Sequence, residues 1–266
     1  MQALSYPPMT QSSDTAKITN AGNSPIVLTG PHNGWEVPDA FYEGGNPLGV
    51  EPYWFDPASE LRRHEACDWG MQDLFDEIER QSSEICLIAA QYSRLLVDIN
   101  RIPSLVIYEG SSETGEHIPG NMMLSDAEKQ QRMEDYYTPY HDTVDAIMQA
   151  TLEKCGSVIW IDMHSFSPVW QGEPRPVGIG TLKLEKTALT NTAEAFLEAE
   201  FKDMFVPDQP YDLAISPHRE MNGGNLIADR NNLEYFGLEI RNDLLGTPKQ
   251  REVMAEKLIK LAKALL

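Results

Sequence analysis

Residues 157–164 read Ser157-Val-Ile-Trp-Ile-Asp-Met-His164, an apolar run that ends in an acid and a histidine. A strand that is apolar at consecutive positions is typical of a sheet buried on both faces by helices. Further runs of this kind lie at residues 24–30, 85–90, 177–182 and 236–241. Because these runs alternate with segments of helical periodicity, the sequence predicts a three-layer α/β/α fold with a mixed, mainly parallel sheet.

Helices are predicted between and after these runs. Asp56 can cap a helix whose pattern extends to about residue 81. Ser125 and Glu128 have the spacing of a capping box, and the helix that follows them extends to about residue 154. The remaining helices are expected at residues 186–203 and 247–266.

The length of the chain suits one α/β domain of the larger kind, which we place at residues 23–266. Residues 1–22 are polar, and we expect them to form a polar N-terminal tail or an early edge segment. Leu95-Leu-Val-Asp-Ile99 is interpreted as a continuation of the run at residues 85–90. Residues 102–124 are expected to be a long loop, and long loops in compact domains are often functional. Residues 204–232 are expected to be rich in loops.

The chain is strongly acidic. Its 266 residues include 41 Asp and Glu but 21 Lys and Arg, which gives a formal net charge of −20. Such a surface repels phosphate groups, so we expect neither nucleic acid nor a membrane as partner. The first residues lack the pattern of a signal peptide, and no apolar run is long enough to span a bilayer. Since three scattered cysteines also fit a reducing compartment, we expect a cytoplasmic protein.

Two histidines follow predicted strands. His32 comes directly after the run at residues 24–30, and His164 ends the run that begins at Ser157. Glu239 lies inside the last apolar run, where a buried carboxylate needs either a compensating partner or a functional role. Ligands of open α/β sheets bind outside the carboxyl ends of the strands, so these side chains are expected to converge at one edge.

Two imidazoles and a carboxylate, with one position open, are the usual donors of a catalytic zinc ion. Such a metal polarises a carbonyl group and lowers the pKa of water, and a further carboxylate can serve as general base. The sequence contains no GxSxG, P-loop or GxGxxG motif. We therefore expect a hydrolase with one divalent metal, zinc, and arginines that dock an anionic substrate.

Several of these residues have structural alternatives. Arg94, Asp98 and Arg101 alternate with apolar residues, so a buried ion-pair network competes with substrate binding as their role. His141 lies near the apolar stripe of its predicted helix, where a hydrogen-bonded, partly buried imidazole is the simpler expectation. For the third metal ligand, local chemistry favours Glu36, which shares a face with His32 if these residues form a helical turn.

Four segments are informative when they are taken together and in their order along the chain. They are Pro31-His-Asn-Gly34, Tyr92-Ser-Arg-Leu-Leu-Val-Asp-Ile-Asn-Arg101, Asp162-Met-His-Ser-Phe166 and Leu238-Glu-Ile-Arg-Asn-Asp-Leu244. Together they resemble N-formylglutamate amidohydrolase-like proteins. The resemblance extends from about residue 24 to residue 245, and the segment 92–101 is its most specific element.

The resemblance implies a zinc-dependent exopeptidase-like fold (phosphorylase/hydrolase-like), related to that of metallocarboxypeptidases. It implies hydrolysis of an N-acyl amino acid such as N-formyl-L-glutamate to formate and the free amino acid, a step of amino-acid catabolism. In the family pattern His32 and His164 are metal ligands and Glu239 is the general base, while Asp68 competes with Glu36 as the third ligand. The substrate carboxylate is expected to meet Arg94, Asn100, Arg101 and Arg175.

Two other functions fit the same residues. One is a carboxypeptidase or deacylase that acts on a different acyl or peptidyl group, and the other is a non-catalytic binding protein for small carboxylates. The chain departs from the family pattern around Gly223-Gly224, which bears on glutamate specificity. The sequence leaves open the oligomeric state and whether residues 102–124 close over the site.

Overall fold

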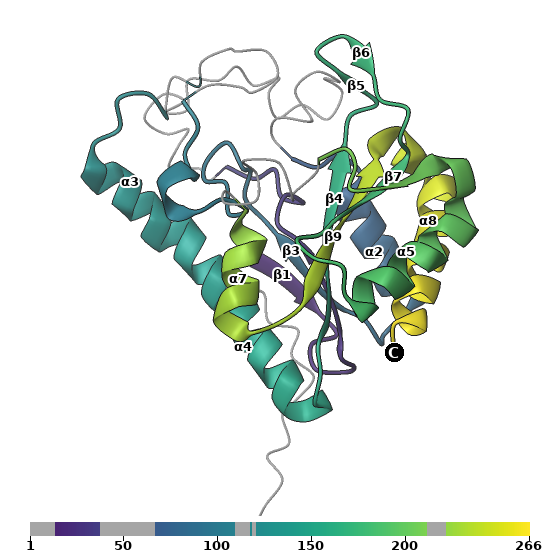
Figure 1. Cartoon of the computed structure of the whole chain (residues 1–266). Helices are drawn as coiled ribbons and strands as arrows, with labels where there is room; N and C mark the ends of the chain where they lie inside the picture. The colour runs from purple at the N-terminus through teal and green to yellow at the C-terminus, as the bar shows by residue number, and fades with distance from the viewer. Residues whose placement is uncertain (1–13, 38–66, 110–117, 119–120, 212–221) are drawn as a thin grey trace, which may run out of the picture.

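The computed structural model describes residues 14–37, 67–109, 118, 121–211 and 222–266. A seven-stranded sheet lies at the centre of the described chain (Figure 1). In spatial order its strands are β1 (Ala16–Thr19), β3 (Cys86–Ala90), β2 (Ile26–Gly30), β4 (Ile159–Phe166), β9 (Tyr235–Arg241), β7 (Ile179–Leu182) and β8 (Phe205–Pro207). A separate hairpin pairs β5 (Val169–Trp170) with β6 (Glu173–Pro174).

Most strand pairs of the sheet are parallel. The central strands β3, β2, β4 and β9 run in one direction. At one edge β1 is antiparallel to β3, and near the other edge β7 is antiparallel to β9 and parallel to β8. The prediction of a mixed, mainly parallel sheet is confirmed. The carboxyl ends of the four central strands therefore lie at the same end of the sheet.

Helices cover both faces of the sheet (Figure 1). One face carries α2 (Met71–Gln81), α5 (Ala188–Phe201) and α8 (Pro248–Ala264). The other carries α3 (Asp126–Arg132), a π-helical segment (Met133–Tyr137), α4 (Thr138–Cys155) and α7 (Gly223–Asn231). Short 3₁₀ turns lie at Pro103–Leu105, Lys202–Met204 and Asn242–Leu245. Among the described residues, no helix combines the length and the apolar character that a membrane span requires.

Strand β4 explains why the apolar runs are continuous. Ile161 is buried in one core cluster with Leu74 of α2 and Leu258 of α8. Its neighbour Trp160 is buried in the cluster on the opposite face, together with Tyr140 of α4. Because successive side chains of a strand point to opposite faces, both sets must be apolar. Full burial of one such side chain contributes about 1.5–3 kcal/mol to stability.

The capping box at Ser125 is confirmed. The Ser125 hydroxyl accepts a hydrogen bond from the backbone N–H of Glu128, and the Glu128 carboxylate accepts one from the backbone N–H of Ser125. These two bonds satisfy donors that the first turn of a helix otherwise leaves unpaired. The helix then continues through the π-helical segment into α4, which ends at Cys155.

The helix predicted from Asp56 is not continuous to residue 81. Helix α2 begins at Met71, and residues 67–70 before it are not helical. Gly70, directly before α2, has a left-handed φ of 81°, so a right-handed helix cannot continue through this residue. A Cβ atom at Gly70 would lie 2.8 Å from the Cβ atom of Leu245, so this backbone also packs closely against the chain that follows β9. Asp56 itself lies outside the described residues.

Two further predictions are wrong in part. Residues 95–99 are buried but do not extend β3 as a strand. Residues 204–232, expected to be rich in loops, contain β8 and α7. Gly223 begins α7, and a Cβ atom on it would lie 2.7 Å from the carbonyl oxygen of Ile99. The glycine is explained by close packing between distant segments, which no local pattern reveals.

The N-terminal segment divides into two parts. Residues 1–13 lie outside the described residues, whereas Ala16–Thr19 forms β1 at the edge of the sheet. Three of its four side chains are buried, and the exposed one is Lys17. The early edge segment is therefore the alternative that holds for this part of the chain, and a charged outward side chain suits an edge strand.

His141 is the buried, hydrogen-bonded histidine that the sequence predicted. It lies 2.8 Å through Nε2 from the carbonyl oxygen of Ile99, and the ring of Tyr137 stacks on it at 4.1 Å between centroids. Burial, outweighing the hydrogen bond to Ile99, lowers the pKa of His141 from 6.5 to about 4. In the unfolded chain His141 takes up a proton below about pH 6.5, whereas in the folded protein it stays neutral until the pH is considerably lower.

We predict that His141 destabilises the protein as the pH falls from 7 to 5. Because the unfolded state binds more protons in this range, the free energy of unfolding decreases with acidification, by about 2 kcal/mol for this one group. Urea unfolding at both pH values should show that His141→Gln, which keeps a hydrogen-bond donor, loses about 2 kcal/mol less than the unsubstituted protein. Equal losses in the two proteins would contradict this role, since all other titrating groups are common to both.

Candidate metal centre and active site

Two histidines lie at the carboxyl ends of neighbouring strands. His32 follows the end of β2 by two residues, and His164 is part of β4, which pairs with β2. Asp68 comes from the segment before α2, and its backbone N–H donates to the carbonyl oxygen of His32 at 2.8 Å. This backbone bond holds Asp68 beside His32, although 35 residues of sequence separate them.

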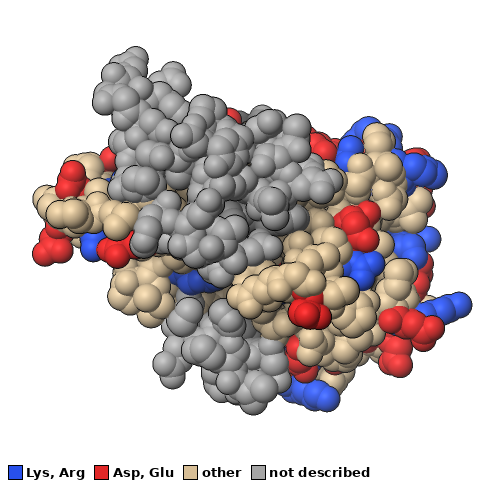
Figure 2. Space-filling model, turned by 90° about the horizontal axis from the view of Figure 1, so that it is seen from above, with Lys and Arg blue, Asp and Glu red and all other residues tan. Residues whose placement is uncertain are grey.

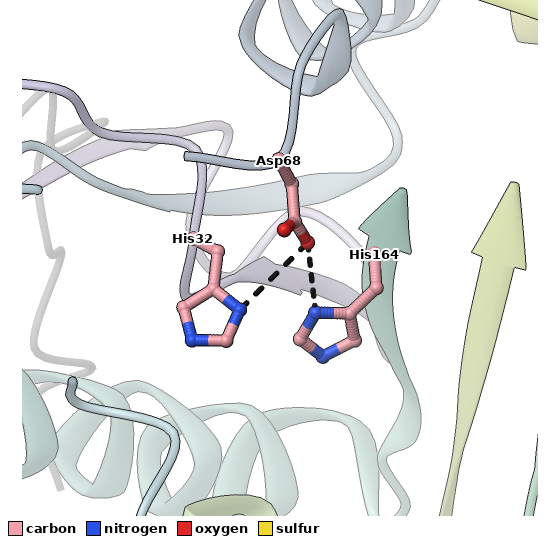
Figure 3. A group of neighbouring side chains, drawn as sticks. All are labelled: His32, Asp68 and His164. Carbon is pink, nitrogen blue, oxygen red and sulfur yellow. Dashed lines mark hydrogen bonds and ion pairs between the residues drawn. The ribbon is translucent and has the colours of Figure 1, made fainter. Parts of the chain in front are cut away.

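These three side chains form one buried cluster (Figure 3). Asp68 Oδ2 lies 3.0 Å from His164 Nδ1 and 3.7 Å from His32 Nδ1. One potential ligand atom of each residue lies within 4.8 Å of the others. Two imidazole nitrogens and a carboxylate oxygen that face a common point have the donor chemistry of a zinc site with an open position.

The outer nitrogens of both rings have carboxylate partners. His32 Nε2 lies 2.8 Å from Asp98 Oδ1, and His164 Nε2 lies 3.0 Å from Asp162 Oδ2. A ring that donates from Nε2 presents a free lone pair on Nδ1, which is the nitrogen that faces Asp68 in both histidines. Metal-binding histidines in proteins commonly have such an outer carboxylate. The residues present therefore fit a metal ion at this site.

Asp98 also has other partners. It accepts hydrogen bonds from the backbone N–H of Asn100 at 2.8 Å and from the hydroxyl group of Tyr108. The Arg101 guanidinium lies 4.0 Å away. These groups compensate a carboxylate that is completely buried, so Asp98 can orient His32 without a large free-energy cost.

The charges of the cluster favour a cation between the histidines. Burial opposes ionisation of Asp68, but the charges of Arg94 and His32 and the hydrogen-bond contact with His164 outweigh it and hold the pKa of Asp68 well below its ordinary value. Burial likewise opposes a charged His164 ring, yet Asp162 and Asp68 outweigh it and hold the pKa of His164 well above its ordinary value. Because the site stabilises positive charge on a ring nitrogen, it can stabilise a metal cation in place of that proton.

Glu239 lies beside the cluster. In the parallel register it is the β9 residue opposite His164, and it is 4 % exposed. Burial raises the pKa of Glu239 to about 7, while His164 and Arg175 act in the opposite direction. A carboxyl group with a pKa near neutrality can both accept and donate a proton. Its position and this pKa fit the predicted general base.

The candidate arginines have different surroundings. Arg94 forms an ion pair with Asp68 Oδ1, the oxygen that faces away from the histidines, so its contact is with a candidate metal ligand. Arg101 donates to the carbonyl oxygen of Asn100 at 2.9 Å and lies beside Asp98. The ion-pair alternative from the sequence therefore describes Arg94 and, more loosely, Arg101. Asn100 itself lies 3.2 Å from His164 Nε2.

Glu36 is not part of the cluster. The helical turn that would put Glu36 on the same face as His32 does not form, because the backbone of Glu36 pairs with residues 91–93 instead. Its N–H donates to Gln91 O at 3.1 Å, and its carbonyl accepts from Ser93 N at 2.9 Å. The side chain of Glu36 is exposed, whereas the three clustered side chains are buried. Asp68 is the acid that the structure brings to the histidines.

Sequence reasoning missed three nearby residues. Asp162 lies two positions before His164, so the alternation of a strand could have placed both on one face. Tyr108 and Tyr211 have no such signal. Tyr211 interacts electrostatically with Glu239 and Asp68. The backbone at residue 209 lies directly against Gly180, where a Cβ atom would overlap it, and Gly180 is the β7 residue opposite Glu239.

The predicted loop 102–124 is described only in part, since residues 110–117 and 119–120 lie outside the described residues. Asn121 donates to the carbonyl oxygens of Leu95 at 2.8 Å and Tyr108 at 2.7 Å. Arg132 in turn donates to the Asn121 side chain at 2.6 Å. The two described ends of the loop are thus tied to each other and to the segment that carries Arg94.

A family model described as N-formylglutamate amidohydrolase matches residues 24–245. An N-formylglutamate deformylase from Pseudomonas putida is 24% identical over 154 residues, which are 54% of this chain and 52% of that protein. The chain thus aligns with about half the length of this curated relative.

Two solved structures resemble the chain over nearly their full length. The gene product Atu2144 from Agrobacterium tumefaciens has a TM-score of 0.78 at 27% identity and covers 94% of both chains. N-formylglutamate amidohydrolase from Ralstonia eutropha JMP134 has a TM-score of 0.59 at 18% identity, covering 93% of this chain and 95% of the other, and shows a shared fold. Because the family match includes the whole segment from His32 to Glu239, this chain belongs to the N-formylglutamate amidohydrolase family, a family of amide hydrolases.

Proposed function

We propose that this protein is a metal-dependent amidohydrolase that removes the acyl group of an N-acyl amino acid, with N-formyl-L-glutamate as the representative substrate. The observation that carries the proposal is the buried cluster of His32, Asp68 and His164 beside Glu239. The family membership supports the amide bond as the target. The products are formate and a free amino acid, which fits amino-acid catabolism.

In this proposal His32 Nδ1, His164 Nδ1 and a carboxylate oxygen of Asp68 hold one divalent metal ion. Zinc suits a set of two imidazoles and one carboxylate better than magnesium or calcium, which prefer oxygen ligands. When bound, the metal supplies a Lewis acid for the acyl carbonyl oxygen and lowers the pKa of water. Asp98 and Asp162 keep the two rings in the orientation that the metal needs.

Glu239 is proposed to move the protons of the reaction. Its carboxylate takes a proton from the attacking water molecule and then gives that proton to the nitrogen of the leaving amino acid. Burial favours this role, because a carboxyl group whose pKa is raised to about 7 binds and releases a proton at little cost near neutral pH. Its position on β9 opposite His164 supports this role.

The remaining polar groups are assigned to the substrate and to support of the ligands. Arg101 lies beside Asp98, and the Asn100 side chain lies 3.2 Å from His164 Nε2; we propose that both meet the substrate's α-carboxylate. We assign Arg94 a second role, because its ion pair with Asp68 keeps that ligand ionised. We place the protein in the cytoplasm, consistent with the free thiols of Cys67, Cys86 and Cys155.

We predict that alanine substitution of His32, Asp68 or His164 abolishes stoichiometric zinc binding, because each removes one of three protein ligands. Metal content after dialysis, measured by inductively coupled plasma mass spectrometry, should fall from about one ion per chain to a small fraction of that. Glu36→Ala is the matched control and should retain the metal. Retention of zinc by all three histidine and aspartate variants would show that the metal lies elsewhere or is absent.

We predict that Asp98→Asn weakens zinc binding by about 10–100-fold without abolishing it, because an amide is a poorer partner for His32 Nε2–H than a carboxylate. Competition with a chromophoric chelator measures this dissociation constant. Asp76→Asn, in which the lost carboxylate pairs with Lys17 on the surface, should leave the constant unchanged. An unchanged constant for Asp98→Asn would mean that the hydrogen bond to His32 does not support a metal ligand.

We predict that Glu239→Gln lowers kcat for N-formyl-L-glutamate by about a hundredfold to ten-thousandfold, because glutamine cannot accept the proton of water. Bound zinc and substrate affinity should be retained, as the exchange preserves shape. The same assay with N-formyl, N-acetyl and N-succinyl amino acids and short peptides tests the deacylase and carboxypeptidase alternatives. Substrate binding without turnover by the unsubstituted, zinc-loaded protein would instead support a binding module.

A further inference from the structure

The hydroxyl group of Tyr108 contacts the carboxylate that supports His32. Asp98 presents Oδ1 to His32 Nε2 at 2.8 Å, and its other oxygen, Oδ2, accepts a hydrogen bond from the Tyr108 hydroxyl. In the described part of the chain no other group donates a hydrogen bond to Asp98 Oδ2, and Arg101 Nε lies 4.0 Å away from it. The contacts therefore run in one line from Tyr108 through Asp98 to His32.

Asp98 depends on protein donors because it is completely buried. Acidic and basic side chains lie on the surface that Figure 2 shows, where water can solvate their charges, but water does not reach Asp98. A buried carboxylate oxygen that loses its donor is costly, so Asp98 without the Tyr108 hydroxyl would turn toward the nearby Arg101. The hydroxyl therefore keeps the plane of the carboxylate fixed, with Oδ1 directed at His32.

Tyr108 is itself held in place by buried groups. Its carbonyl oxygen accepts a hydrogen bond from Asn121 Nδ2 at 2.7 Å, and the completely buried Asn121 accepts one from Arg132 of α3 at 2.6 Å. The backbone N–H of Asp98 donates to the carbonyl oxygen of Val106 at 2.7 Å, two residues before Tyr108. The segment that carries the hydroxyl is thus bonded both to Asp98 and to a helix on the face of the sheet.

The Tyr108 hydroxyl keeps its proton at neutral pH. Burial and the negative charge of Asp98 raise the pKa of Tyr108 well above its ordinary value, although Arg101 acts in the opposite direction. A neutral hydroxyl that donates to a carboxylate forms a charge-assisted hydrogen bond, which is stronger than a bond between two neutral groups. The half-buried ring is therefore a lasting donor to Asp98.

The second histidine has an equivalent arrangement. Thr29 Oγ1 donates to Asp162 Oδ1 at 2.5 Å, while Asp162 Oδ2 lies 3.0 Å from His164 Nε2. Each outer carboxylate thus has a hydroxyl donor on the oxygen that does not face the imidazole. Thr29 lies on the central strand β2, whereas Tyr108 reaches Asp98 from a segment outside the sheet.

We propose that Tyr108 is a positioning residue of the metal centre, whose hydroxyl fixes the Asp98 carboxylate and thereby keeps the Nδ1 lone pair of His32 free for the metal ion. This inference rests on the proposed metal-dependent function. Two carboxylates compete for the proton of the neutral His32 ring, since Asp98 lies 2.8 Å from Nε2 and Asp68 lies 3.7 Å from Nδ1. Only a proton on Nε2 leaves Nδ1 available as a ligand.

The first test measures zinc affinity by competition with a chromophoric chelator. Tyr108→Phe should weaken zinc binding by about three- to tenfold, the change expected when one hydrogen bond is lost. Tyr137→Phe is the matched control, because its hydroxyl donates to the carbonyl oxygen of Arg101 at 3.0 Å and is not bonded to Asp98. The control should retain the affinity of the unsubstituted protein. Equal weakening in both variants would show a general loosening of this segment and would overturn the inference.

A double-mutant cycle tests whether the effect passes through Asp98. In the Asp98→Asn background, which already lacks the carboxylate, adding Tyr108→Phe should change the zinc dissociation constant by less than about twofold. Two independent effects would instead multiply, and that result would contradict the proposed role.

A measurement on the metal-free protein separates this inference from the proposed function. Nitrogen–proton correlation NMR spectra show which nitrogen of the neutral His32 ring carries the proton. The proton should be on Nε2 in the unsubstituted protein and in Tyr137→Phe, whereas in Tyr108→Phe part of the population should carry it on Nδ1, beside Asp68. An unchanged proton position in Tyr108→Phe would overturn the inference. The expected shift in a protein that binds no zinc would support the role of Tyr108 in orienting His32 while refuting the metal-dependent function.

Discussion

The carboxylate of Asp68 is the group on which the arrangement of the site depends. It is buried, and its charge is stable only because Arg94, His32 and His164 surround it. Its two oxygens have different partners. Oδ1 pairs with Arg94, and Oδ2 faces the two histidines (Figure 3). A metal cation bound between the two rings would therefore be balanced by a negative charge that water does not screen.

The same compensation extends outward through the site. Asp98 and Asp162 sit on the outer nitrogens of the histidines, and Glu239 completes a concentration of four buried acids at the carboxyl ends of the central strands. Buried acids need cations or hydrogen-bond donors nearby, and Arg94 and Arg101 compensate part of this negative charge. The proposed metal ion would compensate another part. Arg175 differs from these residues, because its guanidinium lies among the rings of Phe166, Trp170 and Tyr211, which stabilise its charge without neutralising it.

Much of the fold could be predicted, because a strand that is buried on both faces is apolar at consecutive positions of the sequence. The runs at β2, β3, β4 and β9 are apolar at consecutive positions, and each became a central strand. His32 and His164 were found from the same runs, because a strand end is visible in the sequence. The early edge segment, the start of α2 and helix α7 were less visible. Gly70 and Gly223 are required by close contacts with distant residues, and local sequence propensity does not reveal such contacts.

Periodicity and composition were enough to establish the layers, the parallel centre of the sheet and the two histidines at its edge, since these follow from burial along a single strand. They could not choose between Glu36 and Asp68 as third ligand. That choice depends on backbone bonds between segments far apart in the chain, in which Glu36 pairs with residues 91–93 and Asp68 pairs with His32. The bond between His32 and Asp98 likewise joins residues 66 positions apart. Distances of this kind exist only after the chain has folded, and so the folded arrangement, and not the order of residues, selects the acid that faces the two histidines.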